Sequence, residues 1–112
     1  MKAICVPKDF AALNRLDCDV NNPKDLMEVI LNNHVFELLW KTGFFDAINK
    51  LTGSIIDDFE DERITDSGML KKVLESDIFN DFTDNNLRET AQAIRQLFVE
   101  ALNRKTGIHF YF

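Results

Sequence analysis

The stretch that decides the fold is 86–112, which reads NLRETAQAIRQLFVEALNRKTGIHFYF. Its first part predicts a long helix, because its apolar residues recur at helical spacing. They form one stripe: Leu87, Ala91, Ile94, Phe98, Ala101 and Leu102. Asn86 supplies an N-cap and Glu89 an acid at the third helical position, while Gly107 follows the cations of the last turn as a stop signal.

The residues after Gly107 predict a strand. Alternation places Ile108, Phe110 and Phe112 on one face, and His109 and Tyr111 on the other. Ala3–Val6 predicts a second short strand that ends at Pro7. We expect these terminal strands to pair in the core. The alternative is that 108–112 forms an exposed edge, to which a partner adds a strand.

Between the two strands, apolar spacing predicts further helices over 9–16, 23–41, 44–51 and 65–76. The helix 23–41 begins with Asn22 as N-cap, Pro23 as first residue and Asp25 at the positive end of the dipole. Its stripe comprises Met27, Ile30, Leu31, His34, Val35 and Leu38. Asn32-Asn33 is a point where it can break, and 54–62 fits either one or two helical turns or a loop.

The predicted fold class is therefore mainly α (α+β). We expect residues 1–112 to form one compact domain, a bundle of about five helices with short terminal strands that pair. The first apolar stretch is too short for a signal peptide or a membrane span, so we expect a cytoplasmic protein. Cys5 and Cys18 are then reduced, with a disulfide between them as the alternative.

The chain contains 13 Lys and Arg against 19 Asp and Glu, and its net charge of −6 argues against sequence-independent binding of nucleic acid. No phosphate-binding glycine loop or nucleophile elbow is present, and no cofactor or metal site is predicted. His34 is interpreted as a buried or half-buried structural residue. Arg104 and His109 are spaced as in the motif of HEPN ribonucleases, which this stretch resembles, but the glycine between them predicts His109 on a strand instead.

The negative charge is concentrated in one part of the chain. Residues 53–86 contain ten acidic and three basic side chains. The densest run holds Asp57, Asp58, Glu60, Asp61, Glu62 and Asp66, with Arg63 as its counter-charge. One interpretation is a solvated face. The other is a surface that attracts a cationic partner, with Phe59 and Ile64 as apolar anchors at its centre.

In size, acidity (a calculated pI near 4.8) and lack of a catalytic motif, the chain resembles bacterial immunity proteins and antitoxins in general kind. This resemblance implies a cytoplasmic inhibitor that covers the active site of a basic toxin, such as a nuclease. The acidic run then supplies the partner-binding residues, which are Asp57, Asp58, Phe59, Glu60, Asp61, Glu62 and Asp66. The alternatives are a small carboxylate–metal enzyme and a structural or adaptor homo-oligomer, for example a homodimer, joined through phenylalanine-rich surfaces.

Overall fold

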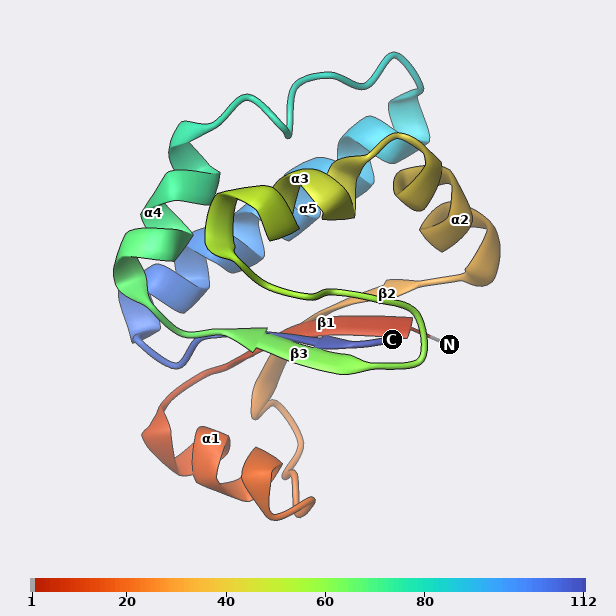
Figure 1. Cartoon of the computed structure of the whole chain (residues 1–112). Coiled ribbons are helices and arrows are strands. Elements are labelled where there is room, and N and C mark those ends of the chain that lie inside the picture. Colours follow the sequence, from red (N-terminus) through yellow and green to blue (C-terminus); the bar gives the residue numbers. More distant parts are fainter. Residues whose placement is uncertain (1) are drawn as a thin grey trace.

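The computed structural model describes residues 2–112, which form a four-stranded antiparallel sheet and five helices. The strands are β1 (Lys2–Pro7), β2 (Leu26–Leu31), β3 (Asp61–Ile64) and β4 (Ile108–Tyr111), in the order β2-β1-β4-β3. The helices are α1 (Phe10–Asp17), α2 (Asn33–Lys41), α3 (Phe44–Thr52), α4 (Ser67–Glu75) and α5 (Asn85–Arg104). Helices α2 to α5 cover one face of the sheet and α1 lies on the other (Figure 1). No helix within residues 2–112 is long and apolar enough to cross a membrane.

The two terminal strands were predicted correctly and form the centre of the sheet. β1 pairs with β4 in a register that places Ala3 opposite Tyr111 and Cys5 opposite His109. Ile4 and Phe110 have no exposed surface, as expected for a core strand pair. The alternative, in which 108–112 is an exposed edge, is wrong because β3 pairs with the other side of β4. The class α+β is confirmed, but the strands are not only terminal and the helices form a layer on a sheet more than a bundle.

The predicted helix 23–41 is wrong in its first half. Residues Leu26–Leu31 form β2, which pairs with β1 over its whole length, and only Asn33–Lys41 is helical. The Asn32 side chain accepts a hydrogen bond from Val35 N at 2.8 Å, so Asn32 is an N-cap and not a helix interior residue. His34 consequently lies exposed in the first turn of α2, and its interpretation as a buried or half-buried residue is also wrong.

The remaining helices follow the prediction closely. α3 ends at Gly53, and α4 begins after Asp66, whose carboxylate accepts from Met69 N at 3.0 Å. The long helix begins slightly earlier than expected, because Asp84 and not Asn86 caps it, with Leu87 N as donor. The segment 54–62 contains no helical turn: 54–60 is a loop, and Asp61 and Glu62 belong to β3, a strand that the sequence did not predict.

Aromatic side chains fill the core between the sheet and the helix layer. Eight of the ten phenylalanines are buried: Phe36, Phe44, Phe45, Phe79, Phe82, Phe98, Phe110 and Phe112. Their rings form a chain of neighbouring pairs from Phe36 near α2 to Phe98 on α5. Most of the phenylalanines therefore belong to the water-free core of the domain. Only Phe10 and Phe59 are largely exposed.

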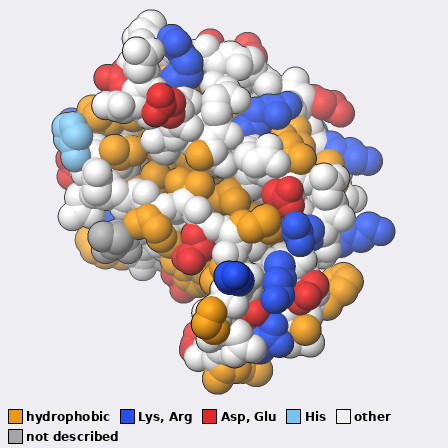
Figure 2. All heavy atoms as spheres, turned by 180° about the vertical axis from the view of Figure 1, so that it is seen from behind, with side chains coloured by type: hydrophobic (Ala, Val, Ile, Leu, Met, Phe, Trp, Pro, Cys, Tyr) orange, Lys and Arg blue, Asp and Glu red, His pale blue; other side chains and the backbone are white. Residues whose placement is uncertain are grey.

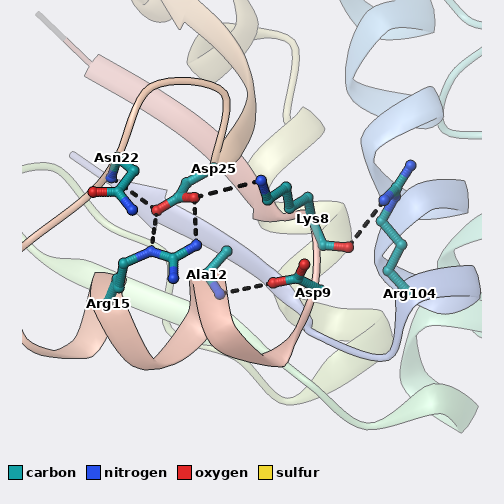
Figure 3. Close-up of polar contacts among 7 residues, drawn as sticks. All are labelled: Lys8, Asp9, Ala12, Arg15, Asn22, Asp25 and Arg104. Atoms are coloured by element: carbon teal, nitrogen blue, oxygen red, sulfur yellow. Dashed lines mark hydrogen bonds and ion pairs between the residues drawn. The ribbon is translucent and has the colours of Figure 1, made fainter.

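Helix α1 is attached to the rest of the fold by a buried carboxylate (Figure 3). Asp25 is 1% exposed and accepts two hydrogen bonds of 2.7 Å from the guanidinium of Arg15 and one of 2.8 Å from Asn22 N. Lys8 Nζ lies 3.8 Å from the same carboxylate. These donors lower the pKa of Asp25 well below its usual range, with the Arg15 hydrogen bonds as the largest cause. Asp25 is thus a buried ionic anchor, and its predicted role at a helix N-terminus is wrong.

Candidate functional site

The acidic run follows α3 as a loop, continues through β3 and ends at the start of α4. We call residues 54–60 the acidic loop. Asn49 fixes its first part, because its side-chain amide donates to Ile56 O at 3.0 Å and accepts from Ile56 N at 2.8 Å. Ile56 is 2% exposed and anchors the loop in the core. The residues after Ile56 are therefore presented at the surface from a fixed base.

A tight turn at Asp57–Phe59 forms the tip of the acidic loop. Phe59 N donates to Asp58 Oδ1 at 2.9 Å and to Phe112 O at 3.0 Å. Phe59 has φ +63°, in the left-handed region, and its side chain is 87% exposed. A large residue in this region is uncommon and needs support from its surroundings. Here the support is one hydrogen bond within the turn, to Asp58, and one that ties the turn to Phe112, the residue after β4.

Three acids of the predicted partner-binding set have roles within the molecule. Asp58 forms an ion pair with Lys2, whose ammonium also donates to Phe112 O at 2.9 Å. Glu62 accepts from Ile55 N and from Arg63 N, both at 2.9 Å. Asp66 caps α4. These carboxylates hold the acidic loop, β3 and α4 in place.

The other three acids, Asp57, Glu60 and Asp61, are exposed and form no ion pair with any residue from 2 to 112. Arg63, the counter-charge within the run, forms its ion pair with Asp17 of α1, at 2.9 Å. The structure therefore leaves the charge of these three carboxylates directed at solvent, along the edge strand β3 and the loop before it.

Of the two apolar anchors proposed from the sequence, Phe59 is exposed and Ile64 is not. Ile64 is 4% exposed and belongs to the core beneath β3, so its predicted part in an interface is wrong. Ile55, which the sequence did not single out, is 71% exposed on the same loop. An isoleucine followed by a second isoleucine gives no local signal of which side chain is buried, and here Ile56 is the buried one.

The rear face of the molecule, opposite to the view of Figure 1, is less acidic than the surface formed by the acidic loop. Figure 2 shows hydrophobic side chains in a band across its middle, with Lys and Arg gathered along one side and Asp and Glu scattered among them. β2, an unpaired edge of the sheet, lies toward this side of the molecule (Figure 1). The two edges of the sheet also differ in sequence, since β3 contains three charged residues in four and β2 one in six.

A polar hollow of about 330 Å³ lies beside β3 and β4 and is lined by Asp61, Glu62, Arg63, His109 and Tyr111. His109 is 1% exposed, and its Nε2 lies 3.1 Å from Thr106 O, so this nitrogen carries the proton. Burial lowers the pKa of His109 and raises that of Tyr111 to about 12. At neutral pH both side chains are therefore uncharged.

Arg104 and His109 lie where the sequence predicted, Arg104 in the last turn of a helix and His109 on a strand. Arg104 pairs with Glu100 at 2.6 Å in the last turns of α5 and donates to Lys8 O at 2.9 Å. His109 lies on β4 opposite Cys5 of β1, and its side chain is 1% exposed. Both residues thus have interactions that hold the α5–β4 corner to β1.

The two cysteines differ in environment. Cys5 is buried on β1 and Cys18 is exposed after α1, and both are free thiols. Burial, with a smaller contribution from the charge of Glu28, raises the pKa of Cys5 to about 12. Since the thiolate is the reactive form, Cys5 is protected both by burial and by protonation.

We expect N-ethylmaleimide at pH 7 to add a single label to the folded protein, at Cys18, and two labels in denaturant. Cys5 should react at least about 100-fold more slowly than Cys18. Intact-mass spectrometry over time measures both rates, and Cys18→Ser is the control that should remain unlabelled while folded. Rapid double labelling of the folded protein would show that Cys5 is accessible after all.

With the geometry of the acidic loop and β3 described, the chain can be compared with known proteins. No protein-family model matches it, and no similar curated protein or solved structure was found. Residues 2–112 contain no group of three or more His, Cys, Asp or Glu side chains arranged to hold a metal ion. The interpretation of the site therefore depends on its own geometry and charge.

Proposed function

We propose that this chain is an acidic inhibitor protein of the cytoplasm, which binds a basic protein such as a nuclease toxin and covers its active site. The observation that carries the proposal is the set of exposed carboxylates at Asp57, Glu60 and Asp61, which form no ion pair with any residue from 2 to 112. Unpaired like charges repel one another, so folding alone gives no reason to gather them. A cationic partner is attracted by the same charges, and this attraction raises both the association rate and the specificity of the complex.

Exposed apolar side chains on the same loop favour a protein as the partner. Phe59 and Ile55 are 87% and 71% exposed, and both lie within a few residues of the unpaired acids. Protein interfaces typically combine a few apolar or aromatic anchors with a polar rim that excludes water. A surface intended only for solubility needs carboxylates and has no use for an exposed phenylalanine beside them.

The acidic loop is also held in a fixed conformation before any partner binds. The Asn49 amide fixes its base, and the Lys2–Asp58 ion pair and the bond from Phe59 N to Phe112 O fix its tip. A loop that is already ordered loses little conformational freedom when a partner docks. In such an inhibitor the three free carboxylates occupy the positions that substrate phosphates take in the active site of the partner.

The test uses charge reversal with a matched control. The protein is used to capture partners from its source organism; the captured protein is identified, expressed and assayed for its own activity. We expect it to be basic and to lose activity when the chain is added in equal amount. The triple variant Asp57→Lys, Glu60→Lys, Asp61→Lys should bind at least about 100-fold more weakly, measured by calorimetry at about 50 mM salt.

The control variant Glu75→Lys, Asp77→Lys, Glu89→Lys makes the same change of net charge. Its three carboxylates are exposed, and none of them forms an ion pair with a residue from 2 to 112. Binding by this control should change less than tenfold. Equal losses in the two variants would mean that total charge and not the acidic loop matters. A neutral or acidic partner, or one whose activity the chain leaves intact, would contradict the proposal.

A further inference from the structure

An aromatic hollow adjoins the acidic loop on the side of α2. Its volume is about 190 Å³, and it is lined by Phe36, Glu37, Trp40, Lys41, Asp57 and Asp58. The rings of Phe36 and Trp40 stack with their centroids 5.7 Å apart and their planes at 28°. Trp40 is partly exposed in this hollow, whereas Phe36 is 4% exposed and lies beneath it, and three carboxylates also line the hollow.

The protein's own Lys2 shows what this aromatic surface can bind. Its ammonium lies 4.6 Å from the centroid of the Phe36 ring and 5.1 Å from that of Phe59, and it pairs with the Asp58 carboxylate. The cation is thus held between ring faces and a carboxylate. Cation–π attraction and ion pairing act together in this arrangement, since the negative face of the ring and the acid both favour the positive charge.

The next ring, Trp40, also has carboxylates in its surroundings, and Lys41 lines the same hollow. Asp57 and Glu37 lie on the rim beside it, and within residues 2–112 the cation–π contacts all involve Lys2 and never Trp40. A second hollow, of about 310 Å³, shares Trp40 and Asp57 and adds Asp46 and Glu60. Tryptophan is the ring that binds cations most strongly, and among residues 2–112 no Lys or Arg makes a cation–π contact with it.

We propose that the hollow at Trp40 receives a lysine or arginine side chain of the basic partner protein, with its charged end over the Trp40 ring and beside Asp57. Long basic side chains have an apolar stem and a charged end. The inference rests on the proposed function and specifies how the partner is recognised. Lys41 lines the same hollow, and its positive charge opposes the entry of a second cation.

A peptide titration tests this without the natural partner. The chain contains one tryptophan, so its indole N–H gives a single signal in a ¹⁵N-correlated NMR spectrum. The probe is the peptide acetyl-Gly-Arg-Gly-Arg-Gly-amide, and the matched control peptide has citrulline in place of arginine. At about 20 mM salt, where screening is weak, we expect the arginine peptide to shift the Trp40 indole signal saturably and the citrulline peptide to leave it in place.

Two single substitutions locate the binding position. Asp57→Asn removes one charge beside Trp40 and should raise the apparent dissociation constant about three- to tenfold. Lys41→Gln removes the competing cation and should lower it about twofold or more. The matched control Glu89→Gln changes an exposed acid on α5 and should leave the dissociation constant unchanged.

The outcomes separate this inference from the proposed function. If the amide signals of Glu60 and Asp61 shift with the arginine peptide while the Trp40 indole does not, cations bind the acidic run but the hollow is not their site. If none of these signals shifts, the acidic loop does not attract cations and the proposed function fails as well. An equal response to the citrulline peptide would contradict recognition of charge, and an indole shift that depends on protein concentration alone would mean that a second copy of the chain occupies the hollow.

Discussion

Replacement of Phe45 by alanine is expected to lower the free energy of unfolding by about 3–5 kcal/mol. The Phe45 side chain has no exposed surface, and its ring centroid lies within 5.1–5.7 Å of four other rings. These neighbours are Phe36, Trp40, Phe44 and Phe112. The substitution removes an apolar side chain from the core and also leaves a cavity that four rigid rings cannot close.

Chemical denaturation followed by far-ultraviolet circular dichroism measures this loss. Tryptophan fluorescence is less suitable, because the Trp40 ring touches Phe45 and its emission would report a local change. Phe10→Ala is the control: Phe10 is 62% exposed on α1, and its removal should change stability by no more than about 0.5 kcal/mol. A loss below about 1 kcal/mol for Phe45→Ala would mean that the ring cluster repacks or is loosely filled.

Phe45 also connects stability with the candidate site. Its ring supports Phe36 and Trp40, which form the aromatic floor of the hollow beside Asp57. The hollow is therefore built on the same stack of rings as the core. This explains why an aromatic surface can be kept at the edge of the fold in a fixed position, ready for a basic side chain.

The sequence predicts the elements whose signals are local and misses the strands β2 and β3, which are defined by pairing with distant segments. Helix α5 and strand β4 are marked by caps, an apolar stripe and a stop residue that lie within one stretch of chain. The run Leu26–Leu31 is apolar nearly throughout and fits either a helix or a buried strand. Its state is decided by pairing with β1, in which Ile4 lies opposite Val29. No periodicity within the run contains that information.

In the candidate site, too, the local sequence predicts some features, and contacts with other parts of the chain decide the rest. The sequence locates the acidic run, but it cannot tell which carboxylates are free. Asp58 is neutralised by Lys2, 56 residues away, and the left-handed backbone of Phe59 depends on a bond to Phe112. Trp40 reaches the acidic loop only because α2 packs beside it. Of the six acids, Asp58 is paired through a long-range contact, whereas Glu62 and Asp66 accept hydrogen bonds from residues nearby in the sequence.

Asp25 is the residue whose role changes most between sequence and structure, and its replacement by asparagine should lower the melting temperature by roughly 10 °C at neutral pH. The carboxylate is nearly fully buried and receives both hydrogen bonds of the Arg15 guanidinium. An asparagine amide places a donor where Arg15 already donates, and it leaves that cation without a counter-charge. The connection between α1 and the sheet is therefore weakened at its centre (Figure 3).

The pH dependence of this effect follows from the pKa of Asp25, which folding lowers below the value of about 3.9 that an aspartate has in an unfolded chain. The unfolded state then takes up a proton at a higher pH than the folded state. The stabilisation is fully present above about pH 5 and is lost as the pH falls toward the folded pKa. The difference in melting temperature between the natural protein and Asp25→Asn should therefore shrink steadily from pH 5 to pH 2.

Circular dichroism melting curves at pH 2 to 7 provide the measurement. Asp81→Asn is the control, because Asp81 is exposed and forms no ion pair with a residue from 2 to 112. Its melting temperature should follow that of the natural protein at every pH. If Asp25→Asn instead differs from the natural protein by the same amount at pH 2 and pH 7, the loss comes from packing, and the charge of Asp25 does not stabilise the fold. A shrinking difference shows that the ionised carboxylate itself attaches α1 to the sheet.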